Sequence, residues 1–506
     1  MPSGPSFGGV TVQSASWIIV GAMVAGGLVS PMSLDAQEAA ARPPDVVCAS
    51  KPGERQTCAA ATGKGVTLLR ETGDVACVLG ATWGYDQKDI WVADGCSAAF
   101  AVGPETATTW GTFTPGAGFK VVKTGKGELN FSLYTYVRYL NQMGLDPTYT
   151  DAFGNTAPVQ QRQDVQFQKV ILYFRGWLLS PRFRYLTYVW STNTSQGLSA
   201  QVVVAGNLTY NINEHFTVGA GINGLPGVRS TEGQFPYWLP VDNRLIADEY
   251  FRPSYTTGIW AAGAVVDRLN YAVMLGNNLS QLGVDAGQLD NGLNTVSASL
   301  VWLPSTGEFG TRSSFGDFDD HRSLATRFAA HYTYSLENYQ GQPATTNFEN
   351  VQIRISNGGI IFAPDIFGPG IWVQDARYQM TSLDAGLKYH GFSLAAAYYG
   401  RWVDSFRGPG TAGLPSLRDD GFQVLASAMA IPRTLQLYVA GSKIYGDYGD
   451  PSDTRVGINW YPWKSQVARW NVEALKLNHS PVGGLSLPYP VGGNGMVYYT
   501  SVEVYF

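Results

Sequence analysis

From Lys126 to Phe506 the chain consists of segments of about ten residues in which apolar and polar side chains alternate, and such segments are typical of strands that cross a membrane. In the first segment Leu129 and Phe131 fall on one face, while Asn130 falls on the other. Successive side chains of a β-strand point to opposite faces, so a period of two predicts strands with one apolar and one polar face.

The last segment keeps this alternation to its final residue. Val502, Val504 and Phe506 share one face, and Ser501 and Glu503 share the other. Chain termini usually fray, so a soluble domain has little reason to end on an aromatic residue of a paired strand. This ending resembles the signal that the outer-membrane assembly machinery reads.

The connections between segments are of two kinds. Short turn-forming stretches occupy residues 210–216, 389–392, 430–434 and 461–465. Longer stretches rich in Gly and Pro occupy residues 224–255, 280–291, 304–322, 406–420 and 477–494. Short turns at one rim and long loops at the other are typical of a transmembrane barrel. We therefore predict an all-β fold in which residues 119–506 form an antiparallel transmembrane β-barrel of about 16 strands. A soluble sandwich or propeller is the alternative, but its strands should be longer apolar runs buried between sheets.

The composition fits a barrel better than a soluble protein. Charged residues make up only 14% of the chain, aromatic residues reach 13%, and there are 59 glycines. A barrel presents an apolar outer face to lipid, a polar inner face to water and girdles of Tyr and Trp at its rims. The net charge of −5 and the absence of a basic block argue against nucleic acid as a partner.

The N-terminus contains a short apolar run at residues 17–29, which is suited to the core of a signal peptide. We expect residues 1–36 to be removed, with Gln37 as the first mature residue. No Lys or Arg precedes the run, and the first one is Arg42. A buried helix or a retained anchor is the alternative interpretation.

Four cysteines, Cys48, Cys58, Cys77 and Cys96, lie within residues 46–102. An even number of cysteines clustered in an exported chain predicts two disulfides, and the spacing leaves three pairings open. Zinc binding is disfavoured because the segment has neither a Cys-x-x-Cys spacing nor a histidine.

The end of this segment carries a Trp-Gly pair, Trp83-Gly84, followed by the run IWVADGCSAAF at residues 90–100. These motifs resemble a family of small four-cysteine bacterial domains of unassigned function. The resemblance implies a compact β-rich module outside the cytoplasm. Trp83 and Trp91 either bind sugar or peptidoglycan or fill a small core. Residues 103–118 read as a linker rich in Gly, Pro and Thr.

Several barrel segments resemble the phosphate-selective porin O and P family. They are residues 241–251 with 258–263, 269–273 with 276–278, 386–394 with 398–402, and 469–473 with 489–495. The resemblance implies a sixteen-stranded barrel, a homotrimer, loops folded into the pore, and anion selectivity from lumenal Arg and Lys. The helical N-terminal extension of that family has no counterpart here, where the four-cysteine segment takes its place.

The polar faces of the predicted strands supply the candidate pore lining. It consists of Lys169, Arg175, Arg327, Lys388, Arg401, Arg455, Arg469 and Glu473. Fixed positive charge along a pore attracts anions. The set also faces acidic residues such as Asp384 and Glu503, so the alternative is that these charges form cross-strand pairs that wet the pore wall.

The stretch 224–255 is the candidate constriction loop, because loops of that length are usually functional. It carries Arg229, Arg244 and Arg252. If it folds inward it narrows the channel, and if it folds outward it is an extracellular cover.

Catalytic motifs are missing, so we expect no enzyme, no cofactor and no metal. The acidic run at residues 317–321 could hold Ca²⁺, although such runs are usually solvated loop tips. We predict an outer-membrane porin for small hydrophilic solutes, including anions such as phosphate, with the N-terminal domain in the periplasm. Its expected partners are outer-membrane lipid, those solutes, further copies in a homotrimer, and peptidoglycan through the N-terminal domain. A barrel-anchored protein that binds cell wall or glycan is the alternative, and an outer-membrane enzyme is less favoured.

Overall fold

The computed structural model describes residues 46–506, except for 61, 63–65, 74, 76, 78–81, 87, 103–112, 115–117, 193–200, 233–237, 281–291, 311–313, 343–352 and 485. The expected signal peptide, residues 1–36, lies outside the described residues, as does most of the expected linker. The chain separates into two compact units, Met1–Glu105 and Thr106–Phe506.

The first unit is a small β-module with two three-stranded sheets. One sheet has the order β1-β6-β3 and the other the order β2-β5-β4. Its strands are β1 (Val46–Ala49), β2 (Arg55–Ala59), β3 (Val66–Glu71), β4 (Trp83–Tyr85), β5 (Asp89–Ala93) and β6 (Ser97–Val102). Disulfides join Cys48 to Cys58 and Cys77 to Cys96. The prediction of two disulfides is confirmed, and the structure selects one of the three pairings.

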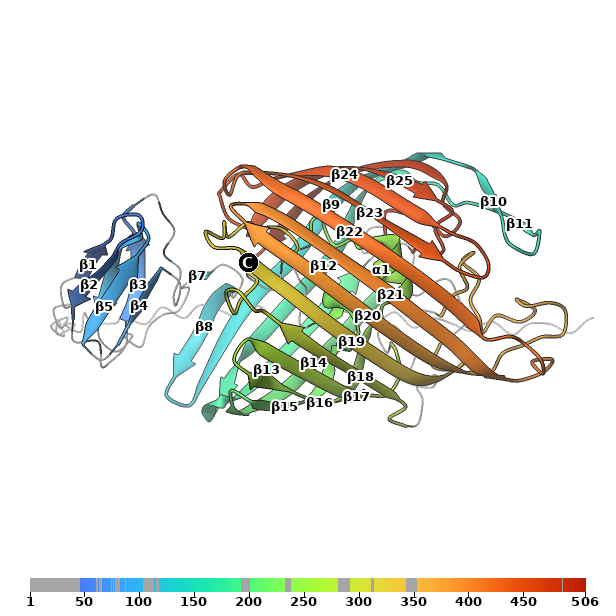
Figure 1. Cartoon of the computed structure of the whole chain (residues 1–506), viewed down its shortest axis with the longest axis horizontal. Helices are drawn as coiled ribbons and strands as arrows, with labels where there is room; N and C mark the ends of the chain where they lie inside the picture. Colours follow the sequence, from blue (N-terminus) through green and yellow to red (C-terminus); the bar gives the residue numbers. More distant parts are fainter. Residues whose placement is uncertain are drawn as a thin grey trace, which may run out of the picture. The chain divides into compact units, whose positions relative to one another are not determined.

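The second unit is a closed antiparallel barrel (Figure 1). Within the described residues its wall consists of β9 (Gly127–Leu145), β12 (Gln163–Leu178), β13 (Ser180–Thr192), β14 (Gln201–Asn213), β15 (Phe216–Gly224), β16 (Tyr255–Val266), β17 (Leu269–Gly276), β18 (Thr295–Trp302), β19 (Ala325–Asn338), β20 (Asp375–Tyr389), β21 (Phe392–Arg407), β22 (Leu417–Ile431), β23 (Leu435–Tyr445), β24 (Ser452–Trp460), β25 (Ala468–Asn478) and β26 (Gly495–Tyr505). The barrel closes because β26 pairs with β9. A hairpin of β7 (Phe113–Thr114) and β8 (Gly118–Thr124) extends the sheet beside the start of β9. The prediction of an all-β barrel with sixteen strands is confirmed.

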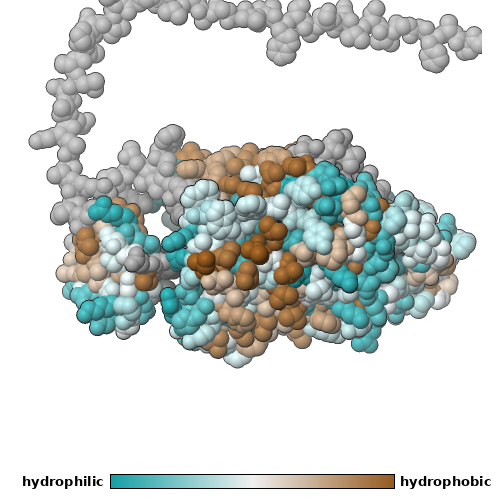
Figure 2. Space-filling model, turned by 90° about the horizontal axis from the view of Figure 1, so that it is seen from above, coloured by the Kyte–Doolittle hydropathy of each residue, from teal (hydrophilic) through white to brown (hydrophobic). Residues whose placement is uncertain are grey.

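The barrel wall has an apolar outside and a polar inside, as the alternation predicts. On β26, Tyr498 and Val502 are 51% and 52% exposed, whereas Glu503 is only 5% exposed. Figure 2 shows apolar residues gathered over the middle of the barrel wall on the face in view. A closed barrel leaves no unpaired strand edge, so its backbone can be satisfied in lipid.

No helix among the described residues is long and apolar enough to cross a membrane.

The two rims of the barrel differ, and we name them by their connections. The turn rim carries the short connections at residues 179, 214–215, 267–268, 390–391, 432–434 and 461–467. The opposite rim is the loop rim. The sequence prediction was wrong for residues 304–322, which it grouped with the long loops of the other rim. They connect β18 to β19, so the up-and-down order of the strands places them at the turn rim. The rim at which a connection lies depends on whether an odd or an even number of wall strands precedes it, and not on the length of the connection.

Two long connections enter the barrel from opposite rims. We name residues 225–254, between β15 and β16, the inward loop, and residues 303–324 the turn-rim loop. The inward loop contains a 3-10 helix (Arg229–Thr231) and α1 (Ile246–Phe251), and α1 contacts β21, β22, β23 and β24. Hydrophobic residues of the inward loop and of the stretch 353–373 pack against wall residues in one buried cluster inside the barrel. Much of the lumen is therefore filled with protein.

Candidate functional site

The inward loop is bound to the inner face of the wall. Arg469 on β25 donates hydrogen bonds to the carbonyls of Trp238 and Leu239 at 2.8 and 3.0 Å. The backbone N–H of Ala247 donates to Ser442 Oγ on β23 at 3.1 Å. These bonds run from loop backbone to lumenal side chains, so residues 224–255 fold inward and do not form an outer cover.

The three loop arginines are held by neighbouring groups. Arg252 pairs with Glu249, and Arg244 lies 3.5 Å from the same carboxylate. Burial favours the neutral form of Glu249, but the Arg252 guanidinium outweighs burial and keeps the pKa of this carboxyl below its usual value. Arg229 donates to the carbonyl of Ser314, in the turn-rim loop, at 2.8 Å. These arginines tie the loop together and to its surroundings.

Most of the predicted pore-lining cations face carboxylates. Arg327 Nε lies 2.8 Å from Asp384 Oδ1, and Arg455 Nη1 lies 3.5 Å from Glu473 Oε1. The remaining pairs are Arg401 with Asp419, Arg455 with Asp453, Arg469 with Glu503, and Lys169 with Asp242. Opposite charges in direct contact cancel much of each other's field. The alternative of paired charges on the wall therefore describes these residues better than a ladder of selective cations.

Lys388 has a different task, which is to hold the turn-rim loop. Its ammonium donates to the carbonyl of Phe309 at 2.7 Å and to Ser314 Oγ at 2.9 Å. Ser393 Oγ on β21 donates to the carbonyl of Phe315, in the same loop, at 2.9 Å. The turn-rim loop is thus fastened to the inner faces of β20 and β21.

The acidic run at residues 317–321 is part of this fastening. Asp317 is fully buried and accepts a hydrogen bond from the backbone N–H of Gly391 at 2.8 Å. Its carboxylate also contacts His321, whose Nε2 lies 2.9 Å from Glu308. Burial opposes protonation of His321, but its hydrogen bonds to Asp317 and Glu308 raise its pKa to about 9. Asp317 is therefore occupied by internal bonds, which disfavours the Ca²⁺ alternative.

A second charged cluster joins the inward loop to the wall. Glu232, His331 and Asp384 bring three ligand atoms within 4.8 Å of one another. Arg327 also contacts both carboxylates, at 2.7 Å to Glu232 and 2.8 Å to Asp384. His331 Nδ1 donates to the carbonyl of Pro226 at 3.0 Å, so its Nε2 faces Asp384. The Arg327 guanidinium already forms ion pairs with both carboxylates, so a divalent cation bound to them would lie next to a buried positive charge. The cluster is better described as a set of ion pairs that holds the inward loop to the wall than as a metal site. We name Glu232, Arg327, His331 and Asp384 the latch.

Arg175 is a predicted lining residue that forms no ion pair among the described residues, although Glu128 lies on the same inner face one row away. It lies on β12, donates to Ser132 Oγ at 2.5 Å, and has its guanidinium 5.6 Å from the ring centroid of Tyr173. Its Nε has no hydrogen-bond partner. Arg184 on β13 is a second such cation, exposed and bonded through Nε to the carbonyl of Pro181 at 3.1 Å. Sequence reasoning missed Arg184, although its spacing of two and four residues from Leu186 and Tyr188 places all three on the inner face.

The wall beside these arginines is lined by small or half-buried side chains. The inner faces of β14 to β17 present Ala205, Asn207, Thr209, Gly219, Gly221, Trp260 and Gly276. By contrast, the inner faces of β19 to β26 carry fully buried Arg and Tyr side chains packed against the two loops. On β12 and β13, Ile171, Tyr173 and Leu186 pack with Val241 of the inward loop in a buried cluster. The room for solutes is therefore expected along β14 to β17, beside Arg175 and Arg184.

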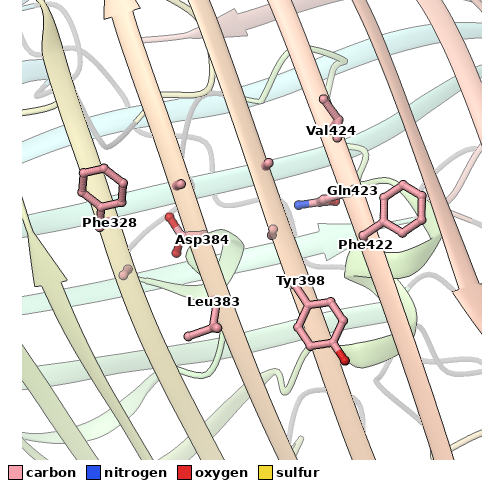
Figure 3. Close-up of a pocket in the computed structure, with 11 residues that line it drawn as sticks. Phe328, Leu383, Asp384, Tyr398, Phe422, Gln423 and Val424 are labelled. Carbon is pink, nitrogen blue, oxygen red and sulfur yellow. The ribbon is translucent and has the colours of Figure 1, made fainter.

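A depression of about 530 Å³ lies on the outer wall, outside the expected route for solutes. Figure 3 shows the residues around it, with Phe328, Leu383, Tyr398, Phe422 and Val424 contributed by neighbouring strands. Its surface is apolar and belongs to the face that meets lipid.

The β-module separates its two tryptophans. Trp83 is 5% exposed and packs against Phe100 in the core. Trp91 is only partly buried, and the guanidinium of Arg55 lies 4.0 Å from its ring centroid. Trp83 thus fills the small core, and Trp91 remains at the surface.

Comparison with known proteins gives matches to each unit. A family described as "Protein of unknown function (DUF3011)" matches residues 24–113, which include the β-module. No curated protein matches the chain.

Three solved outer-membrane proteins are similar in structure. OmpT of Vibrio cholerae is 9% identical and covers 76% of this chain and 99% of its own, with a TM-score of 0.48. The outer-membrane channel DcaP of Acinetobacter baumannii is 8% identical and covers 77% and 100%, with a TM-score of 0.47. The anion-selective porin of Comamonas acidovorans is 10% identical and covers 75% and 100%, with a TM-score of 0.45. Membership of the phosphate-selective family stays a prediction.

Proposed function

We propose that this protein is an outer-membrane channel through which small hydrophilic solutes diffuse, with a preference for anions. The supporting observation is the pair Arg175 and Arg184, two lumenal cations that form no ion pair among the described residues. Fixed positive charge in a water-filled constriction lowers the energy of a passing anion, and the absence of a tight cage allows it to leave. Phosphate is one anion that such a path would carry.

Ion selectivity in planar bilayers tests this proposal. With a KCl gradient across the membrane, the reversal potential of the reconstituted protein should have the sign of chloride preference. The double variant Arg175→Gln/Arg184→Gln should move this potential toward that of a non-selective pore. Arg418→Gln is the matched control, because the Arg418 side chain is 66% exposed on the outer face. Bilayers without stepwise conductance would refute the channel, and an unchanged potential in the double variant would refute the role of these arginines.

We further propose that the turn rim faces the periplasm, which puts the N-terminal β-module there, and that the channel is a homotrimer, as the family resemblance implies. Both ends of the barrel sequence, the start of β9 and the end of β26, lie at the turn rim. Protease added to intact cells should therefore cut the long loops and spare the β-module. Light scattering of the detergent-solubilised protein should give three times the monomer mass.

Binding of the cell wall by the β-module is a second candidate function, and the surface-exposed contact between Arg55 and Trp91 favours it. A guanidinium held against an indole presents its N–H groups to carboxylates, and peptidoglycan carries such groups. Sedimentation with purified sacculi should fall when residues 46–102 are deleted, while conductance should be unchanged. Equal sedimentation of both forms would refute this function.

A further inference from the structure

One row of cross-strand neighbours on the inner wall has a guanidinium at one end and an indole at the other. Two small residues lie between them, and we name these small residues the floor. The strand register pairs Trp177 with Arg184 and Arg184 with Thr209. It continues from Thr209 to Gly219 and from Gly219 to Trp260. Residues paired across neighbouring strands point to the same face, and here that face is the lumen. The row therefore runs from Arg184 on β13 to Trp260 on β16 with only Thr209 and Gly219 between them.

The next row toward the loop rim repeats this arrangement. Arg175 pairs with Leu186, Leu186 with Asn207, and Asn207 with Gly221. A second guanidinium thus lies diagonally from Arg184, one strand away on β12 and one row nearer the loop rim, while Asn207 and a second glycine extend the floor. Thr209 and Gly219 in the first row and Asn207 and Gly221 in the second keep partial exposure, whereas Leu186 is buried.

Trp260 rests on Gly219. A Cβ at Gly219 would lie 2.2 Å from Cε2 of the Trp260 ring, a distance that no side chain tolerates. The ring therefore lies over β15 and leans toward the arginines. Strands lie about 4.8 Å apart, so the three strand spacings between Arg184 and Trp260 leave room for one ring-sized solute above Thr209.

We propose that these two rows form a binding station for a solute that combines a ring with a carboxylate. This inference rests on the proposed channel function and specifies the solute class that the path retains. The carboxylate would accept hydrogen bonds from Arg184 and Arg175, because charge-assisted bonds from guanidinium to carboxylate are strong and directional. The ring would stack on Trp260, whose face offers apolar contact without demanding a particular substituent. Asn207 and Thr209 would meet polar groups on the rim of the solute.

Competition for the conducting pathway tests this station. The full-length protein is reconstituted in planar bilayers in KCl, and potassium benzoate, potassium acetate, benzyl alcohol or inorganic phosphate is added. Benzoate should reduce conductance or add current noise at a concentration at least about tenfold below that of acetate, because only benzoate uses the ring and the charge together. Benzyl alcohol, which has a ring and no charge, should act as weakly as acetate.

Two variants separate the ring contact from general damage. Trp260→Ala should weaken the effect of benzoate about tenfold and leave that of acetate unchanged. Gly219→Ala should do the same without removing the indole, because its methyl group displaces the ring. Trp302→Ala is the control, since Trp302 is 51% exposed on the outer wall. All variants should keep the heat-dependent gel shift of a folded barrel.

The outcomes distinguish the station from the channel. A protein that conducts KCl but responds equally to benzoate and acetate refutes the station and leaves the channel standing. A response to inorganic phosphate that exceeds the response to benzoate also refutes it, because a ring would then be unnecessary. Benzoate block that survives both Trp260→Ala and Gly219→Ala refutes the assigned place. Silent bilayers refute the channel itself.

Discussion

Arg229 in the inward loop and Ser314 in the turn-rim loop are joined inside the barrel by a hydrogen bond of 2.8 Å, although their loops enter from opposite rims. The Arg229 guanidinium also lies 4.1 Å from the ring centroid of Phe315. Lys388 holds the turn-rim loop to the wall. The bond between Arg229 and Ser314 therefore also connects the inward loop to the wall through the turn-rim loop. The interlocked pair fills the side of the lumen along β19 to β26, where the paired charges lie.

Removing the link between the loops should widen the channel. Arg229→Ala deletes a charged donor whose hydrogen bond is worth about 1.5–3 kcal/mol, together with its contact to Phe315. We expect higher single-channel conductance and more open-channel noise. Arg418→Ala is the control, since the Arg418 side chain is 66% exposed on the outer wall and touches neither loop. Identical noise in both variants would show that the link does not restrain the loops.

The turn-rim loop should loosen in alkaline solution. Its His321 has a pKa raised to about 9 by Asp317 and Glu308 against the opposing effect of burial. A pKa above the ordinary value of about 6.5 means that the contribution to stability is fully present below that pH. It is lost as the pH rises through about 9. Thermal unfolding followed from pH 6 to 10 should show this decrease, and His321→Asn should abolish it. A decrease of the same size in the variant would assign the effect to another group.

The latch between the inward loop and the wall should depend on Arg327. Arg327 is 1% exposed and neutralises Glu232 and Asp384, so Arg327→Ala leaves the buried Asp384 and the partly buried Glu232 with too little positive charge. Breaking a buried pair in this way costs about 3–5 kcal/mol. Unfolding by urea in lipid vesicles should report that loss, and Arg327→Ala/Asp384→Ala should recover part of it. The exposed pair of Arg418 with Asp420 is the comparison, where Arg418→Ala should cost about 1 kcal/mol or less. Equal losses at the two sites would contradict the burial argument.

The alternation along the chain was sufficient to predict the barrel, because each wall residue faces either lipid or the lumen. On β26, for example, Val502 and Glu503 occupy the faces that a period of two assigns to them. The same rule gave the inner position of Arg327, Arg401 and Arg455. It could not give their partners, since the register of neighbouring strands decides which carboxylate meets which guanidinium.

The lumen was less predictable than the wall for a physical reason. The turn-rim loop folds inward through Lys388, Asp317 and Phe315, which are contacts between residues far apart in the chain. Such contacts leave no periodic signal, so the sequence does not show that this loop folds inward. Its rim is predicted wrongly for a different reason, because the order of the strands and not the length of a connection decides the rim. Arg184 was missed because its strand, β13, has aromatic side chains on both faces, which weakens the alternation.

Reduction should unfold the β-module and spare the barrel. Cys48–Cys58 and Cys77–Cys96 close loops with sequence separations of 10 and 19, and both lie in the first compact unit. Loops of that size give a disulfide a stabilising effect of about 3 kcal/mol. The module has only a small buried core of Ile90, Phe100 and their neighbours, so losing one bridge should be enough to expose it to protease. We expect Cys48→Ala/Cys58→Ala to be cut rapidly within residues 46–102 while the barrel keeps its heat-dependent gel shift, which depends on strand pairing alone. Protease resistance of the module in that variant, or after treatment with dithiothreitol, would show that its core suffices without the bridges.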